Sequence, residues 1–395
     1  MTERARIAGV GMVPFSTPSK SRTYDVLAEQ AVIAALSDAG LDYTRIQQSY
    51  VGYVYGDSTS GQNALYRVGM TGIPVVNVNN NCSTGSSALW LARQAIESGA
   101  ADCVLALGFE QMRKGPLAAQ WDDRPTPFDR FDEVAHAAQG TKEGVPLAAQ
   151  YFGGAGAAFA ERHGIRPETF AAISVKARKH AAHNPYAVFR DAVTVEDVLA
   201  SPHIFGPLTR LQCCPPTCGA AAAVLCSADF AKTFGLRADV EIAAQAMTTD
   251  RPSSFDADDM VRLVGYDMSA EAASQVYETA GVGPQDVAVV ELHDCFTSNE
   301  LLTYEALGLT PEGTAEKFVL DGDNTYGGRV VTNPSGGLLS KGHPLGATGL
   351  AQCAELVWQL RGQAENRQVA NADIGLQHNI GLGGACVVSM YQKVD

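Results

Sequence analysis

The chain has 395 residues, which exceeds one average domain and suits two domains or one large duplicated domain. Its 43 acidic residues against 29 basic residues give a net charge of −14, which repels nucleic acid and points to no anionic membrane surface as a partner. Hydrophobic residues make up 46% of the chain, but no run approaches the roughly 18 consecutive apolar residues of a membrane span. The start of the sequence lacks the pattern of a secretory signal. We therefore expect a cytoplasmic protein without membrane insertion.

The first half of the chain predicts alternating strands and helices. We expect a strand over residues 5–15, a helix over 28–40 and a second strand over 47–56. Further along, a helix over 86–99 leads into a strand over 103–109. This alternation indicates an α/β fold class.

The second half repeats the same order of elements. A strand over residues 240–247, a helix over 268–281 and a strand over 287–292 correspond to the first three elements. A helix over 348–362 then leads into a strand over 374–379. The first helix of each half ends in Ala-Gly, where glycine serves as a C-cap. The repeat predicts two similar α/β halves.

The rhythm breaks between about residues 113 and 210, where segments rich in proline, histidine and arginine indicate an inserted loop domain. We therefore predict an N-terminal half over residues 1–238, which includes this loop domain, and a C-terminal half over residues 239–395. The loop domain contains a basic run made of Lys176, Arg178, Lys179 and His180. In an acidic chain this run is a candidate for binding ligand phosphates, and a solvated helix face is the alternative.

Cys82 is the first candidate for chemistry. Nine cysteines in a chain of this length are too few for a disulfide scaffold and indicate free thiols. Cys82 stands among small polar residues at the start of a predicted helix, where the partial positive charge of the helix terminus favours a thiolate. The setting predicts an activated nucleophile. A small residue packed at a turn is the alternative, and the residues around Cys82 must decide between the two.

Two histidines lie in settings that are typical of catalytic loops. His293 follows a predicted strand, and His343 is surrounded by glycines. One histidine near a cysteine can accept its proton and a second can polarise a carbonyl, as cysteine-dependent acyl transfer requires. Cys295 lies two residues from His293, so it is a candidate acid or base, and a buried structural thiol is the alternative.

Two other patterns carry less information. Cys213, Cys214 and Cys218 lie close together, but no second spaced pair of ligands accompanies them, so we predict no metal site there. The glycine-rich stretch QHNIGLGGACVVSMY supplies backbone amides of the kind that stabilise an oxyanion, although a glycine run alone is weak evidence.

Four motifs occur together along the chain: NNNCSTGSS, HDCF, NPSGGLLSKGHPLGATGLAQ and HNIGLGGA. In this order they resemble the thiolase superfamily, over essentially the whole chain. The stretch HDCFTSNELLTYEALGL, with DGDNTYGG and GHPLGATGLAQCAEL after it, is similar to the thiolase half of sterol carrier protein x and its stand-alone relatives. Ordinary degradative thiolases carry Asn-Glu-Ala-Phe in place of HDCF, and Cys-x-Gly in place of residues 379–381.

The resemblance implies a thiolase fold, with two similar α/β halves in a five-layered α/β/α/β/α arrangement and a loop domain that holds much of the coenzyme A. It implies that Cys82 is the nucleophile and that His343 activates it and binds the thioester oxygen. His293 would orient a water or the substrate oxygen in a first oxyanion hole. Cys295 would replace the missing acid/base cysteine, and the amides of Cys82 and Gly381 would form the second oxyanion hole.

The activity implied is that of a 3-oxoacyl-CoA thiolase, an acyltransferase. It would move an acyl group between Cys82 and coenzyme A, with release or condensation of acetyl-CoA or propionyl-CoA. Acyl-CoA and coenzyme A would be substrates, with no cofactor and no metal, and the resemblance implies a homodimer.

Two alternatives stay open from the sequence. One is a thiolase-like carbon–carbon lyase of the steroid side-chain aldolase type, whose members replace the catalytic cysteine and histidine positions that this chain retains. The other is a catalytically idle acyl-CoA-binding protein. The chain ends at Asp395 without a sterol carrier domain or a peroxisomal address, so lipid transfer is not expected. Cys218 stands where the resemblance leads us to expect aspartate.

Overall fold

The computed structural model describes residues 4–115, 117, 120–256 and 258–394. Its N-terminal half consists of β1 (Arg6–Met12), α1 (Tyr24–Ala39), β2 (Gln48–Gly52), α2 (Ser60–Tyr66), β3 (Val75–Val78), α3 (Thr84–Glu97), β4 (Cys103–Glu110), β7 (Gly219–Cys226) and α8 (Ala228–Phe234). An insertion between β4 and β7 contains α4 (Asp129–Gln139), α5 (Leu147–His163), α6 (Pro167–Ala181), α7 (Val195–Ala200), β5 (His203–Phe205) and β6 (Leu208–Thr209).

The C-terminal half follows the same plan with additional short helices. Its elements are β8 (Val240–Thr248), α9 (Ser253–Asp256), α10 (Met260–Leu263), α11 (Tyr266–Ala280), β9 (Val289–Glu291), α12 (Thr297–Ala306), α13 (Ala315–Leu320), β10 (Val331–Thr332), α14 (Gly337–Ser340), α15 (Leu345–Leu360), β11 (Ile374–Gly381) and β12 (Ala385–Lys393).

The strands form two half-sheets with the same order and direction. The order is β3-β2-β4-β7-β1 in the N-terminal half and β10-β9-β11-β12-β8 in the C-terminal half. In each, the first three strands are parallel and the fourth runs antiparallel to both of its neighbours. A short pairing of Arg6 and Ile7 with Glu241 and Val240 joins the two into one ten-stranded sheet. The predicted duplication is therefore present in the fold.

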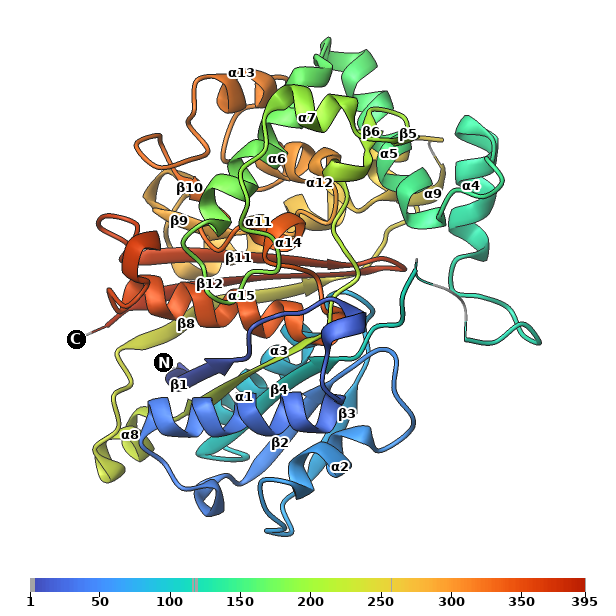
Figure 1. Cartoon of the computed structure of the whole chain (residues 1–395). Helices are drawn as coiled ribbons and strands as arrows, with labels where there is room; N and C mark the ends of the chain where they lie inside the picture. The colour runs from blue at the N-terminus through green and yellow to red at the C-terminus, as the bar shows by residue number, and fades with distance from the viewer. Residues whose placement is uncertain (1–3, 116, 118–119, 257, 395) are drawn as a thin grey trace.

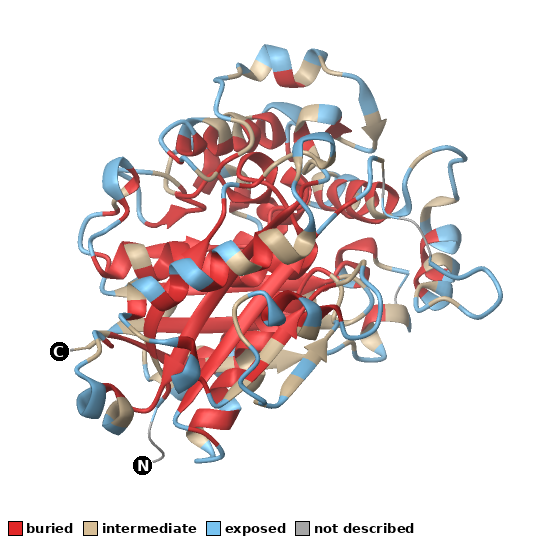
Figure 2. Cartoon of the chain, turned by 60° about the horizontal axis from the view of Figure 1, so that its bottom comes forward, coloured by how far each residue is buried: buried red, intermediate tan, exposed pale blue. Residues whose placement is uncertain are grey.

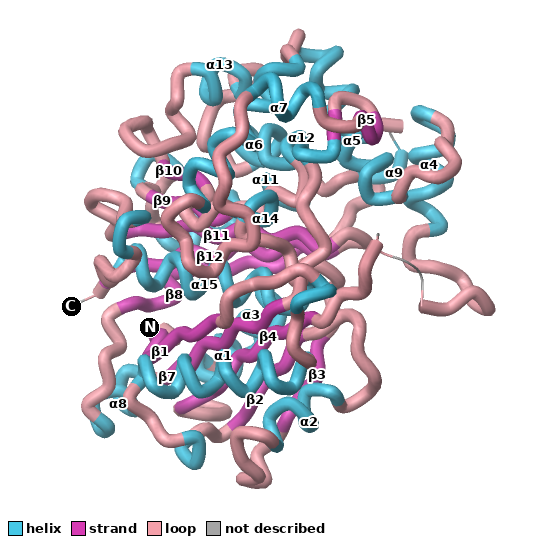
Figure 3. The backbone as a smooth tube through the Cα atoms, in the orientation of Figure 1, coloured by secondary structure: helices cyan, strands magenta, loops and turns pink. Residues whose placement is uncertain are grey.

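Helices cover both faces of each half-sheet (Figure 1). Helices α3 and α15 pack against each other between the half-sheets, α1 covers the outer face of β1 and β7, and α11 covers the outer face of β8 and β12. The backbone tube in Figure 3 shows these layers without side chains. The five-layered α/β/α/β/α thiolase fold expected from the sequence is confirmed.

Burial explains the apolar strands at the centre. Every residue of β4 and of β7 is buried, because helices cover both faces of the sheet there, and such strands read as continuous apolar runs (Figure 2). The outer helix α1 packs directly on the backbone of β1. A Cβ atom at Gly9 would lie 2.4 Å from the carbonyl oxygen of Ala35, so this approach requires glycine.

Small residues at the crossing of α3 and α15 bring the two helix N-termini together. A Cβ atom at Gly85 would lie 2.7 Å from the carbonyl oxygen of Gly346, and one at Gly349 would lie 2.2 Å from Oγ of Ser86. The residues just before each helix, which include Cys82 and His343, therefore come close to one another. The duplicated fold thus places the two candidate loops at one site.

The elements differ from the predicted ones mainly at their ends. The helix expected from residue 28 begins at Tyr24, and the strand expected to reach residue 56 ends at Gly52. Gly40 and Gly281 adopt positive φ angles of 64° and 71° and cap α1 and α11, as the Ala-Gly pattern predicts. Among the described residues, no helix combines the length and the apolar character needed to cross a bilayer.

Candidate active site

Cys82 lies in the turn between β3 and α3. Ser83 occupies the N-cap position of the helix that begins at Thr84, and Asn81 before the cysteine adopts a positive φ of 51°. The side-chain amide of Asn81 donates to the carbonyl oxygen of Leu382 at 2.9 Å, which connects the turn to the residue after β11. The Cys82 thiol lies 3.6 Å from Oδ1 of Asn81. These contacts hold the sulfur at the seam between the two halves.

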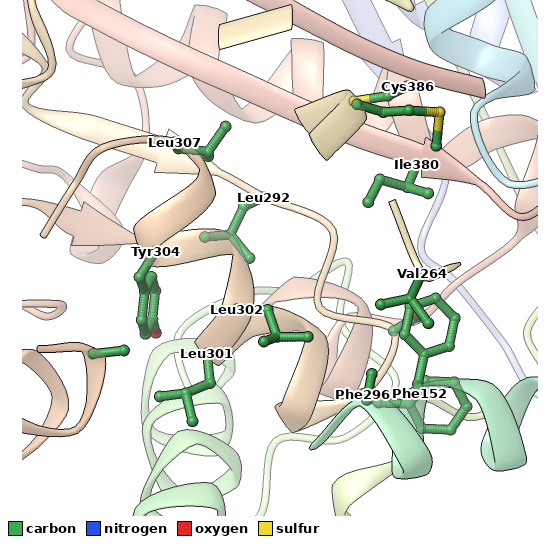
Figure 4. Close-up of a cluster of buried hydrophobic side chains, with 14 of the residues drawn as sticks. Phe152, Val264, Leu292, Phe296, Leu301, Leu302, Tyr304, Leu307, Ile380 and Cys386 are labelled. Atoms are coloured by element: carbon green, nitrogen blue, oxygen red, sulfur yellow. The ribbon is translucent and has the colours of Figure 1, made fainter. Parts of the chain in front are cut away.

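The loop that carries His293 and Cys295 connects β9 to α12. Leu292 and Phe296, at the two ends of this loop, are both buried in the hydrophobic cluster that the insertion shares with the C-terminal half (Figure 4). The Phe296 ring stacks on Phe152 of α5, with centroids 5.1 Å apart. Apolar packing on both sides therefore fixes the polar residues between them.

Asp294, between the two candidates, links this loop to the one that carries His343. Its carboxylate accepts hydrogen bonds from the backbone N–H groups of Leu338 at 2.7 Å and Leu339 at 3.3 Å, in the short helix α14. Burial raises the pKa of Asp294 to about 8, and the nearby Glu300 carboxylate adds to this rise. The Asp294 contacts connect the two histidine loops directly.

The structure brings Cys82, His293 and His343 together. The Cys82 sulfur and one ring nitrogen of each histidine all lie within 4.8 Å of one another. The two imidazole rings have centroids 5.0 Å apart and are nearly perpendicular, at 82°. All three side chains are buried. A thiol and two imidazoles in this arrangement can perform nucleophilic and acid–base chemistry.

Hydrogen bonds assign the proton of His343 to Nδ1. Thr348 Oγ1 donates to the carbonyl oxygen of Pro344 at 2.9 Å, so it accepts from His343 Nδ1 at 2.8 Å. The buried Nε2 atom of His343 has no hydrogen-bond partner among the described residues. Its lone pair is therefore the one available to the Cys82 thiol. Burial lowers the pKa of His343 to about 3, which keeps the ring neutral.

His293 is held from two neighbouring residues of β11. The side-chain amide of Asn379 contacts Nδ1 of His293 at 2.9 Å, and the backbone N–H of His293 donates to Nδ1 of His378 at 3.4 Å. Successive side chains of a strand point to opposite faces, so the two contacts come from the two sides of β11. Burial, with His343 and His378 nearby, lowers the pKa of His293 well below its usual value.

The resting state of Cys82 differs from the sequence expectation. The helix terminus was expected to favour a thiolate, but burial raises the pKa of Cys82 to about 12, and the buried Glu110 carboxylate adds to this rise. Contact with the Leu382 backbone lowers the pKa by less. Cys82 is therefore held as a thiol, and a base would have to take its proton before it could act as a nucleophile.

Cys295 is buried beside this cluster. Burial raises its pKa well above the usual value, and the nearby thiols of Cys214 and Cys82 contribute to the rise. Desolvation therefore dominates the environment of this candidate acid or base. Cys214 lies next to it, with its backbone N–H donating to the Cys295 carbonyl oxygen at 2.9 Å. Cys295 is held as a thiol, the form that donates a proton.

Gly381 ends β11 against the Cys82 turn. A Cβ atom at this position would lie 2.1 Å from the carbonyl oxygen of Asn80 and 2.6 Å from Oγ of Ser83. Only glycine allows this approach. The contact brings the backbone of Gly381 beside the residues that flank Cys82, as a shared oxyanion hole would require.

Glu110, at the end of β4, is a buried carboxylate near Cys82. It accepts backbone hydrogen bonds from Val54 at 3.1 Å, Tyr55 at 3.0 Å and Gly346 at 3.0 Å. Burial raises its pKa to about 7, and these bonds lower it by a smaller amount. Because Gly346 lies in the first turn of α15, Glu110 anchors the helix that follows His343.

The cysteine-rich segment forms no metal cluster in the part of the chain that the structure describes. Cys213 contacts the carbonyl oxygen of Thr209, Cys214 adjoins Cys295, and Cys218 contacts the carbonyl oxygen of Met112. Cys218 is fully buried, so an aspartate at its place would bury a carboxylate. The group with metal-ligand spacing is instead Cys82 with His293 and His343.

The structure contradicts half of the basic run as a phosphate site, because two of its four residues lie in the interior. Lys176 is buried and forms an ion pair with Glu300, and it also donates to Thr332 Oγ1 at 2.6 Å. His180, one turn later, contacts Thr325 Oγ1 at 2.7 Å and the carbonyl oxygen of Asn333 at 3.0 Å. Lys176 and His180 are four positions apart and therefore lie on the same face of α6, which here faces the interior. Of the other two residues of the run, Arg178 is half-buried and Lys179 is exposed.

A hollow of about 510 Å³ lies away from these residues, between α4 and α5. Its lining includes the carboxylates of Asp129, Asp132 and Glu133. An acidic wall repels phosphate groups, so this hollow does not suit coenzyme A.

Thr348 and Asn379 are positioning residues that the motifs did not single out. Thr348 is part of the GHPLGATG segment, and Asn379 stands where ordinary degradative thiolases carry a cysteine. The position of a hydroxyl in the first turn of the helix after His343 is a sequence signal that could have indicated Thr348. The partner of Asn379 lies 86 positions away in the chain, so no local pattern indicates the contact.

Comparison with known proteins agrees with the fold. Residues 6–229 match the family model described as thiolase, N-terminal domain, and residues 248–390 match thiolase C-terminal domain-like. Sterol carrier protein 2 of Bos taurus is 54% identical over 99% of this chain and 73% of its own length. Non-specific lipid-transfer protein-like 2 of Caenorhabditis elegans is 46% identical over 98% of this chain and 95% of its own.

Solved structures agree as well. The Ltp2-ChsH2(DUF35) aldolase superposes with a TM-score of 0.82 and 26% identity, covering 99% of this chain and 98% of that one. Human mitochondrial 3-ketoacyl-CoA thiolase shares the fold with a TM-score of 0.75 at 19% identity, covering all of both chains. Because family models match both halves and a relative is 54% identical over 99% of this chain, the chain belongs to the thiolase family.

Proposed function

We propose that this protein is a 3-oxoacyl-CoA thiolase that uses Cys82 as its nucleophile. The observation that supports this most is the convergence of the Cys82 sulfur with His293 and His343, two neutral imidazoles. Membership of the thiolase family supports the same activity. Acyl-CoA and coenzyme A are the proposed substrates.

In the first half-reaction, His343 Nε2 accepts the proton of the Cys82 thiol. The resulting thiolate attacks the 3-oxo carbon of the substrate, and a sulfur–carbon bond forms. The oxygen of that carbon gains negative charge, which donors in the site must stabilise. We assign this role to the backbone amides of Cys82 and Gly381.

The bond between carbons two and three then breaks, and its electron pair passes to the thioester enolate of the departing acyl-CoA. We assign Cys295 as the acid that protonates carbon two of this enolate. The raised pKa of Cys295 keeps its proton available for this step. His293 holds the thioester oxygen of the same fragment. The products of this half-reaction are acetyl-CoA or propionyl-CoA and an acyl group on Cys82.

In the second half-reaction, coenzyme A takes the acyl group from Cys82. The proton that His343 took from Cys82 first passes to the Cys295 thiolate, which restores a neutral base and a thiol acid. His343 then accepts the proton of the coenzyme A thiol, the new thioester forms, and the Cys82 thiolate leaves and takes this proton from His343. Each half-reaction uses the same base, the pattern of ping-pong covalent catalysis. Because every step is reversible, the same site can condense two acyl-CoA molecules.

One observation favours a second candidate, a carbon–carbon lyase. The Ltp2-ChsH2(DUF35) aldolase gives a higher TM-score than the human thiolase, 0.82 against 0.75. A lyase would release an aldehyde or ketone from a hydroxyacyl-CoA without coenzyme A and without an acyl group on Cys82. We rank it second because Cys82 has two imidazoles beside it, as acyl transfer through a cysteine requires.

The experiment that tests the proposal follows coenzyme A-dependent loss of 3-oxoacyl-CoA and maps the acylated peptide by mass spectrometry. We expect thiolytic turnover and an acyl mass on the peptide that contains Cys82, with both lost in Cys82→Ala. Turnover that does not need coenzyme A, or a Cys82→Ala variant that retains turnover, would overturn the assignment. Aldehyde or ketone release from a 3-hydroxyacyl-CoA would support the lyase instead.

A homodimer is part of the proposal. Strand β3 lies at the end of the N-terminal half-sheet, and among the described residues β2 is its only neighbouring strand, so one edge of its backbone is open there. Tyr66, Met70 and Val76 on and beside this edge are exposed by 53%, 78% and 46%. An edge strand with apolar neighbours is a surface for pairing with another chain. Sedimentation of the wild type against Val76→Lys tests this, with a shift toward monomer expected in the variant.

A further inference from the structure

Asn379 has no role in the bond-making steps proposed above, yet it is fully buried and contacts His293. Its side chain lies between the imidazole and Ser86 of α3. The Ser86 hydroxyl is 2.8 Å from Asn379 Oδ1, and the Asn379 amide nitrogen is 2.9 Å from His293 Nδ1. Which way this amide points decides which nitrogen of His293 carries the proton.

The hydrogen-bond chain begins at a group that can only accept. Gln377 Nε2 donates to the carbonyl oxygen of Gly349 at 2.7 Å, and Tyr391 donates to Oε1 of the same amide, so the orientation of Gln377 is determined. The second hydrogen of Gln377 Nε2 is directed to Ser86 Oγ at 2.8 Å, which lies nearer than the remaining acceptor, Gln352 Oε1 at 3.3 Å. Ser86 therefore accepts from Gln377 and has one hydrogen of its own to donate.

That hydrogen determines the orientation of Asn379. Among the described residues, Asn379 Oδ1 is the only acceptor within reach of the Ser86 hydroxyl. The Oδ1 atom of Asn379 is thus turned toward Ser86, and its NH₂ group toward His293. His293 Nδ1 must then accept, which assigns the proton of the neutral ring to Nε2.

The two histidines consequently carry their protons on opposite nitrogens. Thr348 accepts from His343 Nδ1, which leaves Nε2 of His343 as a lone pair, whereas the Asn379 amide leaves Nε2 of His293 as a donor. Rings in the same protonation form, 5.0 Å apart, would present two bases or two donors to the substrate. The hydrogen-bond networks give the site one of each without any charge.

The same assignment bears on metal binding. Cys82, His293 and His343 have the spacing of a three-ligand site for a cation such as Zn²⁺. An imidazole nitrogen binds a metal only through its lone pair, and ligating histidines donate their other N–H to a carboxylate, carbonyl or water. His293 has the opposite arrangement, since Asn379 donates to it.

We propose that Asn379, held by Ser86 and Gln377, is a positioning residue that fixes His293 as an Nε2–H donor to substrate and thereby prevents the cluster from closing on a divalent cation. The donor role of His293 rests on the proposed thiolase activity. The assignment of its proton and the exclusion of metal do not, so they can be tested without turnover.

The direct test is the ¹⁵N spectrum of the wild-type protein labelled at histidine, with His293 assigned by comparison with His293→Asn. A neutral ring with its proton on Nε2 is expected from pH 6 to pH 8, roughly the range of ordinary histidine titration. A proton on Nδ1 would overturn the proposal. Activity does not enter this measurement, so its result is independent of the proposed function.

The second test uses Asn379→Asp, which should convert the cluster into a site that binds a divalent cation. The carboxylate would accept from Ser86 and from His293 Nδ1, so the proton moves and Nε2 becomes a ligand. Outer-shell partners of metal-bound histidines change affinity by roughly 10- to 100-fold, so we expect Zn²⁺ to bind this variant at least about tenfold more tightly than the wild type, measured by competition with a chelating dye. Thiolytic kcat should fall while the Michaelis constant for coenzyme A stays the same.

The double variant Asn379→Asp with His293→Asn separates ligation from added charge. It keeps the new carboxylate, Cys82 and His343 but lacks the third ligand, so zinc affinity should return to the wild-type level. Equal zinc affinity of the single and double variants, or no gain in the single variant, would overturn the proposal. If Asn379→Asp does not fold, Ser86→Ala provides the comparison. It frees the Asn379 amide to turn, so signal from the Nδ1–H form of His293 should appear, and an unchanged spectrum would contradict the chain of donors.

Discussion

Replacing Thr348 with valine tests the proton assignment of His343. Valine keeps the shape of threonine but removes the hydroxyl that accepts from Nδ1 at 2.8 Å. A buried donor left without a partner costs about 1–3 kcal/mol. The ring can avoid this cost by moving its proton to Nε2, but that nitrogen then no longer offers a lone pair to Cys82. Once the proton has moved to Nε2, acylation of Cys82 requires the less stable form with the proton on Nδ1, so the barrier rises by up to this cost.

At 1.36 kcal/mol per factor of ten, this cost predicts that Thr348→Val acylates Cys82 about 5- to 150-fold more slowly. The measurement is a single-turnover reaction with acyl-CoA, quenched and followed by the mass of the Cys82 peptide. Thr348→Ser is the matched control, because it retains the hydroxyl for both His343 and the carbonyl oxygen of Pro344. It should acylate at nearly the wild-type rate.

Thermal unfolding of both variants separates a local effect from loss of the fold. Thr348 lies in the first turn of α15, and its bond to Pro344 contributes to that turn. If Thr348→Val acylates at the wild-type rate while remaining folded, the proton assignment of His343 is wrong. If serine fails to restore the rate, the methyl group rather than the hydroxyl positions the ring.

Three further predictions follow from buried groups. Cys295→Ala should still become acylated at Cys82 but should lose exchange of the acetyl-CoA methyl protons with deuterated water, and exchange at the wild-type rate would show that Cys295 is a packing residue. Lys176→Met leaves Glu300 buried without its partner and should destabilise the protein by about 3–5 kcal/mol in urea unfolding, while the Michaelis constant for coenzyme A of the folded enzyme stays unchanged. The raised pKa of Glu110, about 7 against 4.5, means that the unfolded chain releases a proton that the folded chain keeps as the pH rises between these values. The free energy of unfolding should therefore fall by on the order of 3 kcal/mol over this interval, and equal pH slopes for the wild type and Glu110→Gln would contradict it.

Local patterns predicted the secondary structure well where burial is uniform. The apolar strand over residues 103–109 and the helix over 86–99 correspond closely to β4 and α3. The pattern of apolar residues determines both elements, and this pattern can be read directly from the sequence. Short elements such as α14, whose anchor is the distant Asp294, have no such period and were not predicted.

The basic run in α6 shows where a local pattern fails. Charged residues within one turn indicate a solvated face or a ligand site when the helix lies on the surface. Here α6 packs against α12 and α14, so Lys176 and His180 face the interior and find acceptors there. Which face of a helix is covered depends on elements more than a hundred residues away, so the charge pattern could not decide it.

The sequence by itself determined the duplicated α/β plan, the glycine caps, and the identity of Cys82, His293, Cys295 and His343 as candidates, because periodicity, turn chemistry and motifs are local properties of the chain. Only the tertiary structure decided the protonation of these groups. Burial outweighs the helix terminus at Cys82 and keeps it a thiol. Thr348 and Asn379, one next to each histidine, set opposite proton positions. Desolvation and hydrogen-bond direction depend on which side chains surround a group in space, and the packing of two halves against each other brings those side chains together.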